Sequence, residues 1–185
     1  MALLDPTIVT IKDGRTATLR CPIREDAEAL LAALHTCLED GVGQVLAPDE
    51  ISLTVEQERA FIDSVREHPG RLFLVAEVSG ELAGSLNLER APRKRMAHTA
   101  MLGMALLPSF RELGLGTALL RACLAWAEAE RIEKVCLHVL ADNGRAIALY
   151  RKLGFVEEGR AARAIRYEDG RYVDDMVMGR YLRPA

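Results

Sequence analysis

The chain has little of what marks nucleic-acid-binding, secreted or membrane proteins. Its formal net charge of −3 gives no electrostatic case for nucleic acid, and the basic run Arg93 to Arg95 fits a solvated hairpin loop. No N-terminal segment has the basic start and apolar middle of a signal peptide. No apolar stretch is long enough to span a bilayer. These absences predict a soluble, cytoplasmic protein without membrane or nucleic-acid partners.

Cysteine and histidine are few and scattered. The four cysteines contain no Cys-x-x-Cys pair, and neither they nor the four histidines show metal-ligand spacing. Cys123 and Cys136 fall in apolar stretches, where a free thiol packs as a small hydrophobic group. We therefore expect reduced, structural cysteines and no metal.

The hydrophobic pattern is that of an α/β protein. Half of the 185 residues are hydrophobic, which suits a single domain spanning residues 1–185. Strand and helix signals alternate and predict a mixed, mostly antiparallel central sheet flanked by helices, with one strand–helix–strand unit late in the chain. The predicted strands are Thr16–Arg20, Leu72–Val78, Leu82–Leu88, His98–Leu107, Val135–Leu140, Phe155–Ala164 and Arg171–Leu182. The predicted helices are Arg24–Leu38, Thr54–His68, Thr117–Arg131 and Asn143–Lys152, and Thr54 with Gln57 has the spacing of a capping box.

A glycine-rich turn follows the strand that ends near Leu107. It reads Arg111-Glu112-Leu113-Gly114-Leu115-Gly116-Thr117 and precedes a strong helix pattern. The glycines allow a ligand to approach the backbone closely, and a helix start presents unpaired N–H groups with the positive end of the helix dipole. This arrangement predicts an anion site suited to a pyrophosphate, with Arg111 as a charged donor at its edge.

Three kinds of phosphate binder have such a turn. A Walker A loop requires Gly-Lys-Ser/Thr, whereas Gly116 is followed by Thr117 and Ala118. A dinucleotide fingerprint requires a third glycine where Leu119 stands, and Glu133 precedes its strand instead of ending it. The remaining candidate is a coenzyme A site.

A second block points the same way. Asn143 and Tyr150 are two helical turns apart, so they share a helix face about 10 Å apart along the axis. Their amide and phenol can contact one extended ligand at two points. The small Ala146 between them would let that ligand lie close.

Together, Arg111–Gly116 and Asn143–Phe155 resemble the two signature motifs of the GNAT superfamily of N-acetyltransferases. The segments Leu19–Ala27 and Gly170–Met178 are similar to the opening and the last strand of many bacterial members, so the likeness covers nearly the whole chain.

The resemblance implies a site for acetyl-CoA. The strand that ends at Leu106 would pair with the pantetheine arm, and Asn143 would hydrogen-bond the same region. The backbone of Arg111, Gly114, Leu115, Gly116 and Thr117 would hold the pyrophosphate. Tyr150 would protonate the departing thiolate, because a phenol with a pKa near 10 stays protonated at neutral pH. The implied activity is direct transfer of an acetyl group to an amine in a ternary complex.

Several points stay open in the sequence. The general base is Glu89, His98 or a water, and the amine acceptor is not identified. A catalytically silent acyl-CoA sensor is the alternative function, followed by a nucleotide-dependent protein. Exposed strand edges in open sheets invite pairing, which predicts a homodimer.

Overall fold

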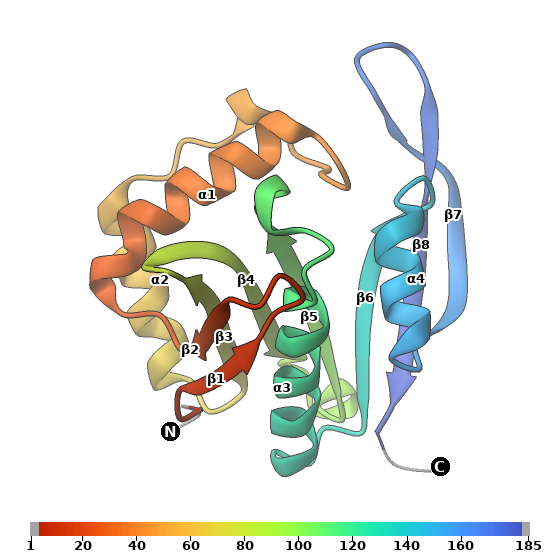
Figure 1. The fold of residues 1–185 in the computed structure, drawn as a ribbon. Helices are drawn as coiled ribbons and strands as arrows, with labels where there is room; N and C mark the ends of the chain where they lie inside the picture. The colour runs from red at the N-terminus through yellow and green to blue at the C-terminus, as the bar shows by residue number, and fades with distance from the viewer. Residues whose placement is uncertain (1–3, 183–185) are drawn as a thin grey trace.

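A computed structural model describes residues 4–182 (Figure 1). All strands in this range belong to one twisted sheet. The sheet order is β1-β2-β3-β4-β5-β6-β8-β7, and every neighbouring pair is antiparallel except β5–β6. The strands are β1 (Thr7–Thr10), β2 (Thr16–Arg20), β3 (Arg71–Val78), β4 (Glu81–Arg90), β5 (Thr99–Leu106), β6 (Lys134–Leu140), β7 (Val156–Arg166) and β8 (Tyr172–Tyr181). The helices are α1 (Ala27–Asp40), α2 (Val55–Glu67), α3 (Leu115–Ala129) and α4 (Gly144–Lys152). The predicted fold class, a mixed and mostly antiparallel α/β sheet flanked by helices, is confirmed.

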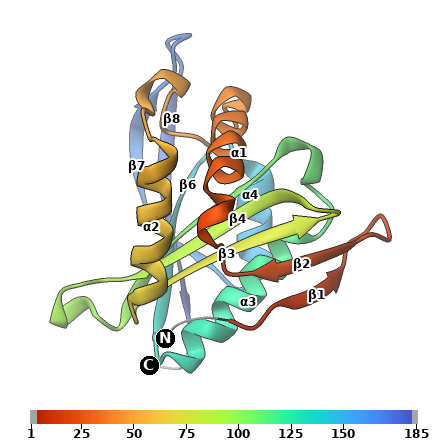
Figure 2. The same ribbon diagram turned by 90° about the vertical axis from the view of Figure 1, so that its left-hand side faces the viewer.

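Helices cover both faces of the sheet, as Figures 1 and 2 show from two sides. Alternate residues of β3 divide between two hydrophobic clusters, because successive side chains of a strand point to opposite faces. Leu72 and Leu74 join the cluster that contains α3 and α4, whereas Phe73 and Val75 join the one that contains α1 and α2. The predicted capping box at Thr54 is present at the start of α2.

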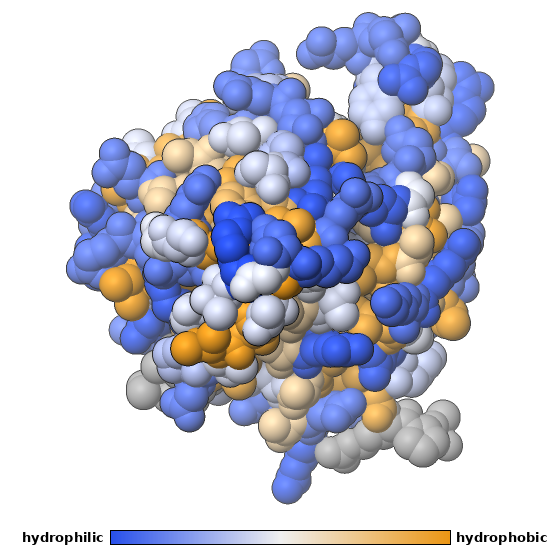
Figure 3. All heavy atoms as spheres, in the orientation of Figure 1, coloured by the Kyte–Doolittle hydropathy of each residue, from blue (hydrophilic) through white to orange (hydrophobic). Residues whose placement is uncertain are grey.

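The single parallel pairing comes from the unit β5-α3-β6. Helix α3 carries β5 to β6, its parallel neighbour, by the long crossover that such a pairing requires. The next unit is different, because β8 inserts between β6 and β7 and pairs antiparallel with both. Hydrophilic residues cover most of the face seen in Figure 3, including the projecting end of the β7–β8 hairpin.

The structure adds one strand to the prediction and moves the start of one helix near the glycine-rich turn. Strand β1 was not predicted, because its four residues are mostly exposed and lack a clear alternation. Helix α3 begins at Leu115, two residues before the predicted start at Thr117, so Gly116 lies inside its first turn. No helix within residues 4–182 is both long and apolar enough to cross a bilayer.

Candidate functional site

Strands β5 and β6 stop pairing about halfway along their length. They pair in parallel only over Thr99–Leu102 and Lys134–Leu137. Beyond these residues β5 continues along β4 to Leu106, while β6 continues along β8 to Leu140. Since each strand is held by its other neighbour, a gap opens between them in the middle of the sheet.

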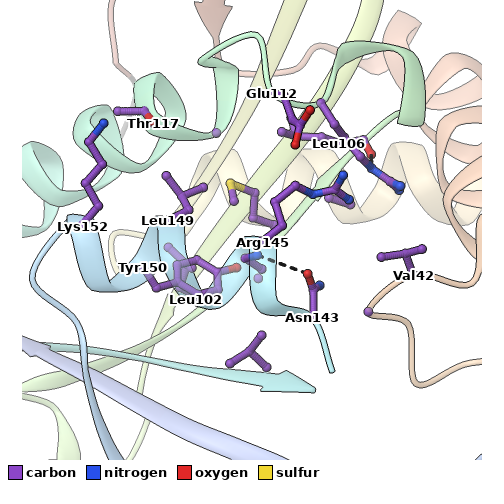
Figure 4. Close-up of a pocket in the computed structure, with 18 of the residues that line it drawn as sticks. Val42, Leu102, Leu106, Glu112, Thr117, Asn143, Arg145, Leu149, Tyr150 and Lys152 are labelled. Carbon is purple, nitrogen blue, oxygen red and sulfur yellow. Dashed lines mark hydrogen bonds between the residues drawn. The ribbon is translucent and has the colours of Figure 1, made fainter. Parts of the chain in front are cut away.

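A cavity of about 400 Å³ occupies this gap (Figure 4). Its walls come from β5, β6, the start of α3, α4 and the loop after α1. They include Val42, Gly43, Leu102, Gly103, Met104, Ala105, Leu106, Gly114, Gly116, Thr117, His138, Val139, Asn143, Ala146, Leu149 and Tyr150. The wall combines apolar side chains with polar and charged ones, which suits a small-molecule ligand that carries both kinds of surface.

Backbone groups of β5 point into the gap. The Leu107 N–H donates to the Ala83 carbonyl of β4 at 3.0 Å, and peptide groups alternate in direction along a strand. The peptide groups of Met104 and Leu106 therefore face away from β4, on the side where β6 no longer pairs. The Met104 N–H and carbonyl and the Leu106 N–H are therefore open to an extended ligand, whereas the Leu106 carbonyl already accepts from Arg111 Nε.

The start of α3 supplies a second set of donors. Gly114 is the N-cap with a φ of 94°, a left-handed conformation that glycine adopts without steric cost. The first bond to the helix runs from the Ala118 N–H to the Gly114 carbonyl at 3.1 Å. The N–H groups of Leu115, Gly116 and Thr117 consequently have no acceptor inside the helix, and the helix dipole makes their environment favourable for an anion.

Arg111 lines the cavity, but most of its polar groups are already engaged. Its guanidinium pairs with Asp40 at the end of α1, and its Nε donates to the Leu106 carbonyl at 3.1 Å. Its backbone N–H donates to Pro108 at 3.3 Å. Arg111 therefore ties α1 to the end of β5 and leaves only part of its side chain for a ligand.

Four further charged residues line the cavity, and none of them was predicted from the sequence to be part of the site. Lys12 comes from the β1–β2 turn, and Arg145 and Lys152 come from α4. Glu112 also lines the wall, with a φ of 65° that is uncommon outside glycine. Lys12 lies outside both sequence motifs, whereas Glu112, Arg145 and Lys152 lie within them but were assigned no role from the sequence.

Asn143 caps α4. Its side-chain oxygen accepts a hydrogen bond from the Ala146 N–H at 3.2 Å, drawn as the dashed line in Figure 4. Its amide nitrogen lies against Gly43, where a Cβ atom would come within 2.4 Å of it. The residue thus holds the start of α4 and also lies on the cavity wall.

These two roles of Asn143 can be separated. We expect Asn143→Ala to lower the free energy of unfolding by about 1 kcal/mol, because an N-cap acceptor is lost. Asn143→Asp keeps an acceptor and should keep that stability, yet weaken the affinity for acetyl-CoA because the amide donor is gone. Urea unfolding and calorimetric titration measure the two effects. Equal stability of all three proteins would show that the cap contributes nothing.

Tyr150 is buried against the floor of the cavity. Its ring packs edge-on against Phe155, with centroids 5.8 Å apart and an interplanar angle of 60°. Burial raises the pKa of Tyr150 to about 12. Among the residues that the structure describes, no hydrogen-bond partner contacts its hydroxyl. The phenol is therefore protonated at neutral pH and free to donate to a ligand.

The two residues proposed as general base lie elsewhere. Glu89 pairs with Arg71, its Oε1 accepting from Nε at 2.9 Å, and His98 precedes the first residue of β5. Both are at the end of the sheet opposite the gap, and neither lines the cavity. The cavity has a different histidine, His138, which the sequence analysis passed over although it is a polar position within an apolar strand.

Comparison with known proteins identifies the family to which this fold and cavity belong. Residues 31–155 match the model of the acetyltransferase (GNAT) family. The chain belongs to the GNAT family. The resemblance inferred from the two motifs is thereby confirmed. The protein is an acetyl-CoA-dependent N-acetyltransferase, as that resemblance implied.

Individual relatives are similar to this protein over most of its length. The protein is 34% identical over 164 residues to the L-amino acid N-acetyltransferase AaaT of Escherichia coli (strain K12), a match covering 83% of this chain and 98% of that one. A GNAT acetyltransferase from Streptococcus pneumoniae has a TM-score of 0.85 and 31% identity, covering 89% of this chain and 99% of that one. The fold is also that of yncA from Salmonella typhimurium, solved with acetyl-CoA, at a TM-score of 0.81 and 18% identity over 91% of this chain and 95% of that one.

Proposed function

We propose that this N-acetyltransferase acts in the gap between β5 and β6, by direct transfer of the acetyl group from acetyl-CoA to an amine of a small molecule or a protein N terminus. The observation that carries the proposal is the gap itself. It combines exposed strand backbone, free N–H groups at the start of α3 and a protonated tyrosine in one cavity.

The residues present fit acetyl-CoA as co-substrate. The pantetheine arm would take the place of the missing part of β6 and pair with the Met104 N–H and carbonyl and with the Leu106 N–H. The pyrophosphate would lie against the N–H groups of Leu115, Gly116 and Thr117. Leu102, Val139 and Leu149 offer apolar contact.

The chemistry requires a proton donor for sulfur and donors for the carbonyl oxygen. The amine lone pair forms the new C–N bond while the C–S bond breaks. Backbone N–H groups of β5 are placed to stabilise the negative charge on the carbonyl oxygen. Tyr150 gives its proton to the leaving sulfur as the C–S bond breaks. The raised pKa of the phenol keeps it protonated at neutral pH, so the donor is in place when the thiolate forms.

A covalent cysteine route finds no support at this site. None of the four cysteines lines the cavity, and burial raises the pKa of the Cys37, Cys123 and Cys136 thiols. A thiol with a raised pKa is a poor nucleophile at neutral pH. Direct attack by the amine is the simpler course.

Free-thiol release from acetyl-CoA tests the proposed function. The panel holds L-amino acids, peptides with free N termini, lysine peptides, polyamines and aminoglycosides, each against an amine-free blank. Release above the blank with one class supports the transferase and names its acceptor class. Absence of release, with a melting temperature still raised by acetyl-CoA, would instead support a silent acyl-CoA sensor.

We also propose a single domain over residues 1–185, a cytoplasmic location and a homodimer. The dimer is supported by β7, an edge strand of 11 residues exposed along most of its length. Val156 and the β8 residues Tyr172 and Tyr181 add exposed apolar surface nearby. Light scattering at micromolar concentration should give twice the 20.4 kDa mass of one chain. A mass equal to one chain would contradict the dimer.

A further inference from the structure

His138 lies where β6 leaves β5. Leu137 is the last residue of β6 paired with β5, so His138 is the first residue at the inner end of the gap. Leu137 and Val139 are buried, 1% and 7% exposed, whereas the His138 side chain is 52% exposed. Alternation along the strand therefore directs the imidazole to the sheet face opposite the buried side chains, where solvent and an acceptor can reach it.

A carboxylate orients this imidazole. The Asp175 Oδ2 of β8 lies 2.6 Å from the His138 Nδ1. In the register of β6 and β8, His138 stands opposite Val177, so Asp175 is its diagonal neighbour on the same face. A carboxylate accepts the Nδ1 proton, which leaves Nε2 of the neutral ring as a proton acceptor.

Charged groups of other elements, Lys12, Glu112, Arg145 and Lys152, line the same cavity as His138. Strand β5, from Thr99 to Leu106, has no titratable side chain. Cys136, two residues before His138 on the same strand face, is a thiol whose pKa is raised by burial, so it stays neutral. On the strands beside the pair, several charged groups form ion pairs with one another: Arg160–Glu157, Arg160–Asp174 and Lys134–Glu158. Arg163 and Arg166 lie over the Tyr172 ring, and Arg180 donates to the Leu153 carbonyl. Asp175 is thus the charged group that bonds the His138 ring.

We propose that His138 is the general base of the acetyl transfer and that Asp175 is its positioning residue. The inference rests on the proposed function. It replaces Glu89 and His98, which lie at the far end of the sheet, with a residue on the cavity wall.

The protons balance in this scheme. Nε2 of His138 takes one proton from the acceptor ammonium and later releases it to solvent. The freed lone pair forms the C–N bond, and the C–S electron pair leaves with sulfur, which takes the Tyr150 proton. The second proton lost by nitrogen passes through water and restores the Tyr150 hydroxyl.

The test uses three variants and an acceptor found in the thiol-release panel. We expect His138→Gln to lower kcat/KM by about 100-fold, because the acceptor ammonium loses the group that takes its proton. Asp175→Asn should lower kcat/KM by about 10-fold, because the ring loses the acceptor that selects its tautomer. His98→Gln is the matched control and should behave as the wild type. The Kd for acetyl-CoA should be unchanged in all three.

A second acceptor separates proton removal from loss of structure. An analogue of the acceptor with a hydrazide in place of the amine is already neutral at pH 7 and needs no base. The defect of His138→Gln should shrink from about 100-fold to less than about 10-fold with this analogue. Equal defects with both acceptors would contradict the base, as would wild-type activity of His138→Gln. Lack of turnover by the wild type with every amine would instead overturn the proposed function, and this inference with it.

Discussion

Replacing Tyr150 with phenylalanine is expected to lower kcat by about 100-fold or more while leaving the Kd for acetyl-CoA nearly unchanged. The substitution removes only the hydroxyl, which has no hydrogen-bond partner among residues 4–182. The ring keeps its edge-on contact with Phe155, so the cavity keeps its shape. What is lost is the proton for the leaving thiolate, which then departs as an anion.

A matched control distinguishes this role from packing. Tyr167 also has a hydroxyl, which donates to Asp142 at 3.2 Å, but it does not line the cavity. Tyr167→Phe should therefore leave kcat unchanged. Thermal unfolding of Tyr150→Phe should match the wild type, since no internal hydrogen bond is removed. Full turnover in Tyr150→Phe would mean that the residue serves only to pack the cavity floor.

The second large effect is expected at Gly116. Gly116→Val should raise the Kd for acetyl-CoA by about 10- to 100-fold, as expected when one charge-assisted hydrogen bond worth about 1.5–3 kcal/mol is lost. A Cβ atom at this position would come within 3.0 Å of the Leu149 side chain and 3.4 Å of the Leu106 side chain. The valine methyl groups would then occupy the space over the α3 donors, where we place the pyrophosphate.

Gly144 provides the control for this substitution. It is the first residue of α4, and a Cβ atom there would meet nothing within 4 Å. Gly144→Val should therefore bind acetyl-CoA as the wild type does. Circular dichroism verifies the fold of both variants, and calorimetric titration gives the Kd values. An unchanged Kd in folded Gly116→Val would remove the pyrophosphate from the start of α3.

Local sequence patterns were sufficient to predict most of the fold. Local helix signals predicted the four helices: apolar spacing indicated the first, and the capping box of Thr54 and Gln57 correctly marked the start of α2. The strand–helix–strand unit was confirmed as the parallel pair β5–β6. Asn143 and Tyr150, chosen for their spacing, both line the cavity, because α4 keeps them on one side.

Tertiary structure determined what the sequence could not predict. The gap exists because β5 and β6 follow different neighbours after Leu102 and Leu137, and no local pattern marks where pairing stops. The engagement of Arg111 with Asp40 joins residues 71 positions apart. His138 could have been noticed as an exposed polar position in an apolar strand, but its partner Asp175 is 37 positions away.

Amide hydrogen exchange with and without acetyl-CoA tests most directly whether the gap is the binding site. Acetyl-CoA is expected to slow exchange in two segments, residues 103–107 at the end of β5 and residues 114–118 at the start of α3. Exchange should not change in the β7–β8 hairpin at residues 164–171, which does not line the cavity. Unchanged exchange in both segments, under conditions where acetyl-CoA binds, would contradict binding in the gap.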